Sequence, residues 1–261
     1  MSINLTVLLE NTKQDQSPFE VEHGLSIYVR TNHSTFLFDC GHTGIAFSNA
    51  ILMNIDLSKV EFIVLSHSHY DHAGGFPALL KFANLKKIYT GRNFWQEKFS
   101  KTAEGYKYRG AGFTFQDLAR WRIEQKICDD ILELDKNSWL IGNFDTRYKF
   151  EIPEKFVRGE EKIADNFDDE ICLVLREGDG VAVVVACSHV GILNIVSTVQ
   201  KKLDLPIKSV IGGVHLNNAD SARIDKTLTT LENWGVKRFA LCHCSGDDIR
   251  TNFSTGSVLE L

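Results

Sequence analysis

Three histidines and one aspartate stand within six consecutive positions, directly after a short run of apolar residues. They are His67, His69, Asp71 and His72. A single histidine is more often a core or surface residue than a ligand, but four such side chains at this spacing are hard to explain as structure. Imidazole and carboxylate groups are ligands of zinc and similar divalent cations. Because a bound cation lowers the pKa of its water toward ~7, the segment predicts metal-assisted attack by water or another nucleophile.

The spacing within this segment predicts two metal positions. Alternation in an extended or tightly turning chain puts His67 and His69 on the same side. Asp71 and His72 come one step later and are expected to face a second ion, since paired hydrolytic metals lie about 3.5–4 Å apart. Gly74 and Gly75 follow, and glycine permits a sharp entry into the next helix.

The pattern His67-x-His69-x-Asp71-His72 resembles the signature of the metallo-β-lactamase superfamily. The resemblance extends over most of the chain, because this family also has an aspartate after an early strand, a histidine after a mid-chain hairpin and a histidine near the C-terminus. The corresponding residues here are Asp39, His189 and His243. The resemblance implies an α/β protein with the αβ/βα four-layer sandwich of the metallo-β-lactamase fold, whose metal site lies at one edge of two packed, mixed sheets.

The resemblance also implies how the ligands divide between the two metals. The first metal is expected on His67, His69 and His189, and the second on Asp71, His72 and His243. Asp39 is expected behind the ligands, where a carboxylate orients a ligating imidazole; a simple turn residue is the alternative. Zinc is the expected metal, with iron or manganese as alternatives, because histidine and aspartate accept all three.

One position departs from the family pattern. Many members carry an acidic residue after a late strand that bridges the metals, whereas the corresponding stretch here contains His215. A neutral imidazole has one free lone pair and cannot bridge as a carboxylate does. His215 could ligate one ion, act as a general acid–base or oxyanion donor, or form a hydrogen bond in its loop. Asp71 and His215 are the predicted catalytic residues, and a site with one metal stays an alternative to a site with two.

Four cysteines and the remaining histidines are predicted to lie outside the site. Cys242 and Cys244 flank His243, so on a strand both would point away from it and into a core. Cys40 and Cys187 are likewise predicted to pack. The histidines without ligand-like spacing are His23, His33 and His42; the exception to this prediction is His42, which is close enough to Asp39 in sequence to be a candidate for the site.

The elements that must position these residues alternate between strands and helices. Hairpins are predicted where β-branched and aromatic residues flank a polar turn, at residues 25–38 and 171–186. Shorter apolar runs predict buried strands at 62–65, 210–211 and 239–241. Helices are predicted at 44–54, 75–83, 191–202 and 219–234. Because these strands end at loops that carry histidines, their ends are expected to converge on one edge of a single domain, residues 1–261.

Between about residues 91 and 169 the pattern changes to scattered aromatic residues with few clean strands, and we interpret this segment as an inserted lid. A structureless connection of this length is improbable in a compact domain, so the segment should contain some helix. From Arg92 to Arg109 it has five basic residues against two acidic ones. Arg92 and Lys98 are therefore predicted to contact an anionic substrate, with a solvated face as the alternative.

Two further stretches are similar to a narrower branch of the family. Residues 187–192 and 212–216 resemble the dihydropterin ribofuranosylaminobenzene-phosphate synthase-like proteins. This resemblance implies a pterin- or phosphate-bearing small molecule and makes group transfer an alternative to hydrolysis. Two other functions stay open: a lactonase, thioesterase or phosphodiesterase of another branch, and a protein that binds metal or ligand without turnover.

Composition limits the partners. The 261 residues carry a formal net charge of −5, which argues against neutralising a nucleic-acid backbone. No apolar run reaches the ~20 residues of a membrane-spanning helix, and no secretory signal is visible. Six cysteines are too sparse for a disulfide framework and fit reduced thiols. We therefore expect a cytoplasmic protein that acts on a small molecule and has neither nucleic acid nor membrane as a partner.

Overall fold

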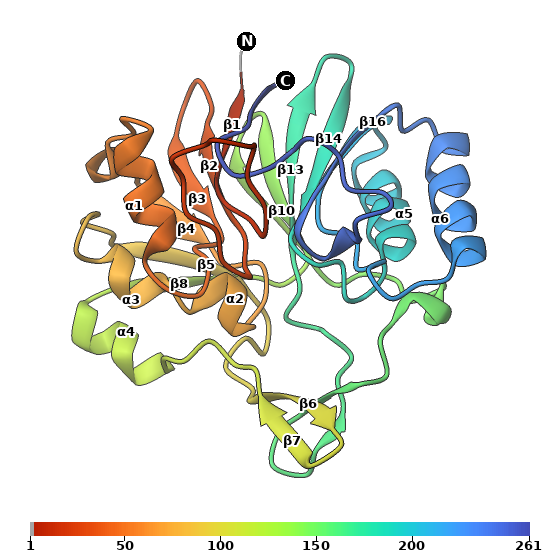
Figure 1. The fold of residues 1–261 in the computed structure, drawn as a ribbon, viewed down its shortest axis with the longest axis horizontal. Coiled ribbons are helices and arrows are strands. Elements are labelled where there is room, and N and C mark those ends of the chain that lie inside the picture. The colour runs from red at the N-terminus through yellow and green to blue at the C-terminus, as the bar shows by residue number, and fades with distance from the viewer. Residues whose placement is uncertain (1–2) are drawn as a thin grey trace.

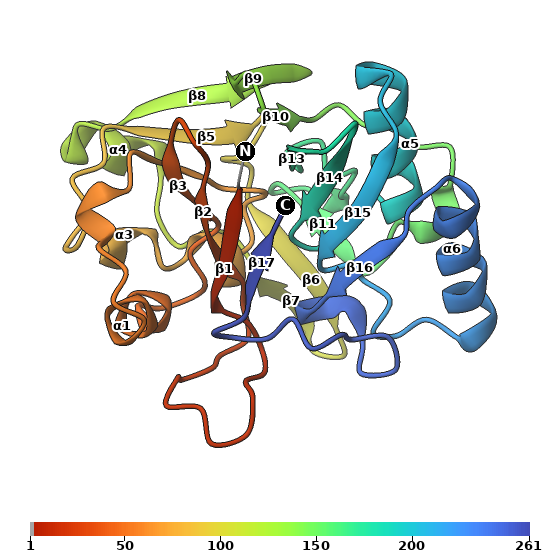
Figure 2. The same ribbon diagram turned by 90° about the horizontal axis from the view of Figure 1, so that it is seen from above.

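Two mixed β-sheets pack face to face in the computed structural model, which describes residues 3–261 (Figures 1 and 2). Residues 1 and 2 of the predicted domain lie outside the described residues. The first sheet has seven strands in the order β17-β1-β2-β3-β4-β5-β8. Its strands are β1 (Asn4–Leu9), β2 (Ser26–Arg30), β3 (Thr35–Phe38), β4 (Phe62–Val64), β5 (Lys87–Gly91), β8 (Glu124–Cys128) and β17 (Val258–Glu260).

The second sheet has six strands in the order β16-β15-β14-β13-β10-β9. Its strands are β9 (Ile131–Asp135), β10 (Ser138–Ile141), β13 (Cys172–Glu177), β14 (Gly180–Val185), β15 (Ile207–Gly212) and β16 (Arg238–Leu241). Alternate apolar side chains of the two sheets meet in the central core, among them Phe36, Phe38, Leu173 and Val184, all fully buried. Both predicted hairpins are present, as β2–β3 and β13–β14.

Helices cover the outer face of each sheet, which completes the predicted αβ/βα sandwich (Figure 1). The helices are α1 (Ile45–Leu52), α2 (Tyr70–Ala73), α3 (Phe76–Leu79), α4 (Phe115–Trp121), α5 (Ile192–Leu203) and α6 (Ser221–Asn233). Three short 3₁₀ segments lie at Leu57–Lys59, Lys149–Glu151 and His243–Ser245. Asp220 caps α6 by accepting a hydrogen bond from Arg223 N. Within residues 3–261, no helix has the length and apolar character that crossing a membrane requires.

The helix predicted at 75–83 is shorter in the structure, where α3 covers Phe76–Leu79, and at its start the chain crosses other backbone very closely. A Cβ atom at Gly75 would lie 2.2 Å from the carbonyl oxygen of Cys40. Only glycine fits such an approach. The backbone of Cys40 in turn donates to His72 O at 2.8 Å, which ties the histidine-rich segment to the end of β3.

The predicted insertion at about residues 91–169 divides into two parts. Strands β8, β9 and β10 are edge or near-edge strands of the two main sheets. The other part is a separate four-stranded sheet, in the order β12-β11-β6-β7, of which β6 and β7 are seen at the bottom of Figure 1. Its strands are β6 (Lys98–Thr102), β7 (Gly105–Tyr108), β11 (Phe156–Arg158) and β12 (Ile163–Ala164). The segment holds more strands than its sequence predicted, because edge strands such as β8 expose most of their side chains and lack an apolar run.

A buried glutamate near the start of α5 makes stability depend on pH. Glu151 accepts a hydrogen bond from Leu193 N at 2.9 Å, and its side chain is almost completely buried. Burial raises the pKa of Glu151 to about 7, although the N–H groups of α5 and the charge of Arg223 act in the opposite direction. Since this folded-state pKa lies above the ordinary value of 4.5, the contribution to stability is present below pH 4.5 and is lost as pH rises through 7.

We therefore expect the free energy of unfolding of Glu151→Gln, compared with that of the parent, to improve as pH rises. Between pH 4.5 and pH 8 the difference between the two proteins should shift in favour of the variant by about 3 kcal/mol. Urea unfolding at both pH values measures this change, and the exposed neighbour Glu154→Gln is the control. If the free energy of unfolding changed with pH in the same way in Glu151→Gln and in the parent, the pKa of this carboxyl would not differ between the folded and unfolded states.

Candidate metal centre

Four strands deliver residues to one edge of the sandwich, and each ends in a residue with left-handed backbone. Asp39 follows β3, Ser188 follows β14, His215 follows β15 and His243 follows β16, with φ values of 60°, 59°, 51° and 53°. This conformation is uncommon for residues other than glycine and is found at functional sites. It bends the chain sharply after each strand, so side chains far apart in sequence meet at this edge beside His67–His72.

The first predicted cation position is formed by three buried imidazoles. His69 Nδ1 lies 3.1 Å from His67 Nε2 and 3.1 Å from His189 Nε2. Zinc–nitrogen bonds of 2.0–2.1 Å in a tetrahedron place ligand nitrogens about 3.3 Å apart, so these three atoms fit one ion. Burial lowers the pKa of His69 to about 3 and holds the pKa of His67 and His189 well below its usual value. At neutral pH all three rings are therefore uncharged and have a lone pair available for a metal.

The second predicted position lies between Asp71, His72 and His243. The Nε2 atoms of His72 and His243 are 3.2 Å apart, and Asp71 Oδ2 lies 3.6 and 3.7 Å from them. Burial acts to raise the pKa of Asp71, but the imidazoles around it hold that pKa well below its usual range. Although burial acts to lower the pKa of His72, Asp71 and Asp39 raise it to about 9. The local field thus favours a positive charge at this point, which a divalent cation supplies.

Asp39 supports the second position from behind. Its Oδ1 accepts a hydrogen bond from Ser66 N at 2.7 Å, and its Oδ2 accepts from Ser66 Oγ at 2.7 Å and lies 2.8 Å from His72 Nδ1. The carboxylate is fully buried. A carboxylate on Nδ1 fixes the ring so that Nε2 faces the metal, which is the role expected of Asp39.

The predicted substrate contacts Arg92 and Lys98 are corrected by the structure. Lys98 is buried, and its Nζ lies 2.7 Å from Asp169 Oδ1 and 2.8 Å from Asp165 Oδ2. Arg92 binds the side chain and the backbone oxygen of Asp129 and does not line the cavity. The charge count of the segment was correct, but it could not show which of its cations already had carboxylate partners.

Lys98 instead belongs to a buried network that braces the ligands. Asp169 Oδ2 accepts hydrogen bonds from both N and Oγ of Ser68, each at 2.9 Å, and Ser68 lies between His67 and His69. The ammonium group of Lys98 neutralises Asp169 on its other side. The adjacent Glu170 accepts from the backbone N of His189 at 2.8 Å. Both sides of the first cation position are thus fixed by carboxylates.

Cys187 and Cys244 do not simply pack in a core, as the sequence predicted, because both line the cavity at the site. Cys187 Sγ lies 3.2 Å from His72 Nε2, and the ligand atoms of His67, His72 and Cys187 lie within 4.8 Å of one another. The thiol therefore lies beside one predicted ligand of each cation position, His67 of the first and His72 of the second. In the sequence, Cys187 lies two residues before the predicted ligand His189, directly after a strand, and this spacing is the signal that could have placed the thiol at the site. Cys40 and Cys242 are fully buried in the cores.

His23 joins the site without any sequence signal. Its Nε2 lies 3.1 Å from Asp71 Oδ2, and its ring stacks on that of His243 with centroids 5.0 Å apart. It comes from an irregular loop before β2, so no periodicity could predict its position. The ring of His42 meets that of Tyr70 edge to face, with centroids 4.8 Å apart, and His33 lies in the exposed turn between β2 and β3.

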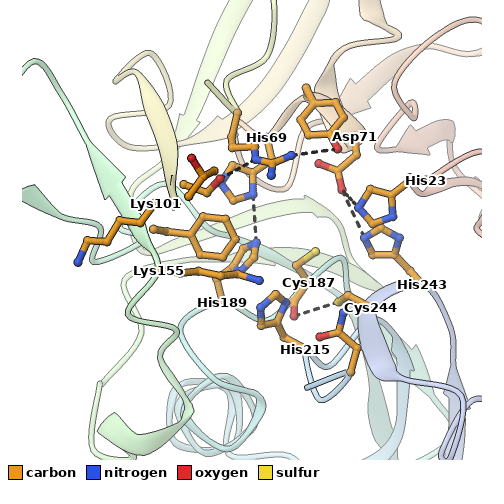
Figure 3. A pocket seen from close by; sticks show the side chains of 16 residues that line it. His23, His69, Asp71, Lys101, Lys155, Cys187, His189, His215, His243 and Cys244 are labelled. Carbon is orange, nitrogen blue, oxygen red and sulfur yellow. Dashed lines mark hydrogen bonds and ion pairs between the residues drawn. The ribbon is translucent and has the colours of Figure 1, made fainter. Parts of the chain in front are cut away.

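The centre opens into a cavity of about 220 Å³. Figure 3 shows His69 and Asp71 on one wall and His215 on the opposite wall. The ring of His215 lies 4.6 Å from that of His189, and its Nδ1 is buried with no hydrogen-bond partner among residues 3–261. His215 is thus placed to offer a nitrogen to a bound molecule or ion, and no hydrogen bond in its own loop accounts for that nitrogen.

A sandwich of two sheets with clustered histidines at one edge defines a class of metal-binding proteins, and sequence comparison gives its family. A model of the metallo-β-lactamase superfamily matches residues 20–171, more than half of the chain, so the chain belongs to that superfamily.

Similar proteins agree with this assignment. A Methanocaldococcus jannaschii protein named 7,8-dihydropterin-6-methyl-4-(β-D-ribofuranosyl)-aminobenzene-5′-phosphate synthase is 29% identical, over 94% of this chain and 88% of its own. The crystal structure of Tm1679, described as a metal-dependent hydrolase of the β-lactamase superfamily, has a TM-score of 0.84 with 28% identity and covers 99% of both chains. Human tRNase Z, short form, shares the fold, with a TM-score of 0.56, 16% identity and 98% coverage of both chains.

Proposed function

We propose that this protein is a metal-dependent enzyme that hydrolyses, or transfers a group on, a small anionic molecule bearing a phosphate or a pterin. The observation that carries the proposal is the meeting of two sets of buried ligand atoms, around His69 and around Asp71, at the wall of one cavity. The name of the similar Methanocaldococcus jannaschii protein supports the substrate class. A cavity of about 220 Å³ and a net charge of −5 favour a small molecule over nucleic acid.

Bound divalent cations would supply a water of lowered pKa and an electrophile for a carbonyl or phosphoryl oxygen. The residues of this chain prepare that chemistry. Asp39 and Asp169 hold the ligand segment in place, and the buried imidazoles offer lone pairs at neutral pH. His215 faces the cavity from the other wall and can exchange a proton with the reacting group.

The ligand set favours zinc over harder ions. Imidazoles are suited to zinc, iron and copper, but a thiol such as Cys187 next to His72 adds preference for a soft or borderline ion. Iron is the second choice, and manganese fits less well because it prefers oxygen ligands.

Removing and restoring the metal tests this function. Protein stripped with a chelator is assayed on a phosphodiester, a lactone, a thioester and a pterin ribosyl phosphate, before and after addition of zinc, iron(II) or manganese(II). We expect zinc to restore turnover of the pterin ribosyl phosphate at least ~10³-fold over the stripped protein, because a metal supplies several kcal/mol of transition-state stabilisation. Turnover of only the phosphodiester, the lactone or the thioester would place the chain in another branch, and silence with every metal would favour a binding protein.

A further inference from the structure

Three basic side chains line the metal cavity, and all come from the small third sheet or from residues next to its strands. Lys101 lies in β6, Arg109 directly follows β7 and Lys155 directly precedes β11. Figure 3 shows Lys101 and Lys155 on the side of the cavity away from His23 and His243. Asp71, a predicted metal ligand, is the only carboxylate among the residues that line this cavity. The wall therefore carries an excess of positive charge.

The two lysines are neighbours across the sheet. Lys101 N donates a hydrogen bond to Lys155 O at 2.8 Å, and both side chains are exposed. Like charges side by side on neighbouring strands destabilise a sheet unless an anion lies between them. Within residues 3–261, no ion pair joins Lys101, Lys155 or Arg109 to a carboxylate, whereas Arg158 of the same sheet pairs with Asp168 at 2.7 Å.

Arg109 is held in place beside the metal centre. Its Nε donates to Ser100 Oγ at 2.9 Å, and its guanidinium lies 5.7 Å from the centre of the Tyr70 ring. The backbone is fixed as well, because Tyr70 N donates to Arg109 O at 2.8 Å. The guanidinium is thus ordered against the residue that directly precedes Asp71, and no carboxylate among residues 3–261 forms an ion pair with it.

We infer that Lys101, Arg109 and Lys155 bind the phosphate monoester group of the substrate, a subsite separate from the metal ligands. A guanidinium forms paired hydrogen bonds with phosphate oxygens, and lysines act as point charges toward it. Three positive charges fit a phosphate dianion better than a single carboxylate. The inference rests on the proposed function, since it assumes that the reacting group of the same molecule meets the metal centre.

Binding of inorganic phosphate to the zinc-loaded protein tests the subsite by calorimetry at constant ionic strength. We expect Lys101→Met/Lys155→Met to weaken phosphate binding at least ~10-fold, with Arg109→Gln acting in the same direction. The matched control is Lys107→Met/Lys136→Met, which removes two exposed lysines outside the cavity and should change the affinity less than twofold. Zinc content and thermal melting of each variant show that the fold and metal centre are intact.

Equal phosphate affinity in the parent and in Lys101→Met/Lys155→Met would overturn the inference, because phosphate would then bind at the metals alone. The source of the phosphate is tested by competition in both proteins: inorganic phosphate that raises the KM of a phosphate-bearing substrate more in the parent than in Lys101→Met/Lys155→Met supports a substrate subsite, and an equal rise, or none, in the two proteins overturns it. Failure of the proposed function is distinguishable, since it appears as absence of zinc-dependent turnover even when phosphate affinity responds to the lysines as expected.

Discussion

Replacing His69 with alanine is expected to lower kcat/KM by about 10³-fold or more and to remove about one equivalent of metal per chain. His69 Nδ1 is the atom that lies 3.1 Å from both His67 Nε2 and His189 Nε2, so its loss leaves two ligands that cannot hold an ion in a tetrahedral site. Loss of the cation removes several kcal/mol of stabilisation from the charge that develops in the transition state. Steady-state kinetics and elemental analysis of the purified variant measure the two effects.

His33→Ala is the matched control for this experiment. His33 lies exposed in the turn between β2 and β3, so the substitution removes the same side chain without touching the site. It should retain parental kinetics and metal content. A His69→Ala protein with unchanged turnover would mean that the first cation position takes no part in the reaction.

Lys98→Met is expected to destabilise the protein by about 3–5 kcal/mol. Lys98 is the only cation within 4.0 Å of Asp165 and Asp169 in the described chain, and all three side chains are buried. Removal of one partner from a buried ion pair leaves an uncompensated charge, which costs far more than the pair itself contributes. Because Asp169 also holds Ser68, the variant should bind its metal more weakly as well. Urea unfolding followed by circular dichroism measures the stability.

Two further variants test whether the loss of stability in Lys98→Met comes from the buried ion pairs. Lys107→Met, on the exposed strand β7, should change the free energy of unfolding by less than about 0.5 kcal/mol. Lys98→Met/Asp165→Asn should recover part of the lost stability, because one of the two stranded charges is removed. If Lys98→Met unfolded at the same urea concentration as Lys107→Met, the buried network would not be a source of stability.

The sequence predicted the architecture because the relevant signals are local. Residues 25–38 and 171–186 alternate apolar side chains around polar turns, which is the period of a half-buried hairpin, and both form as expected. The histidine cluster at 67–72 is equally local, so its spacing alone predicts a metal site without any knowledge of tertiary contacts. The predicted ligands that are distant in sequence, His189 and His243, follow from the family resemblance and not from spacing.

The remaining site residues depend on tertiary contacts that no local pattern records. Lys98 and Lys101 are three residues apart in the same basic segment, yet one is neutralised by two aspartates and the other lines the cavity. The sequence predicts that Cys187 packs in a core, because cysteine is commonly a buried residue. Cys187 is buried, but its thiol lies against His72. His23 lies in a loop whose path is set by packing, so its contact with Asp71 could appear only in three dimensions.

The central claim is that two cations lie at the meeting point of these strand ends, and anomalous diffraction from crystals of freshly purified protein tests it most directly. Data collected on both sides of the zinc absorption edge should give one peak among His67, His69 and His189 and a second among Asp71, His72 and His243. Crystals in which either position lacked anomalous density, although the protein retained full activity, would contradict the account.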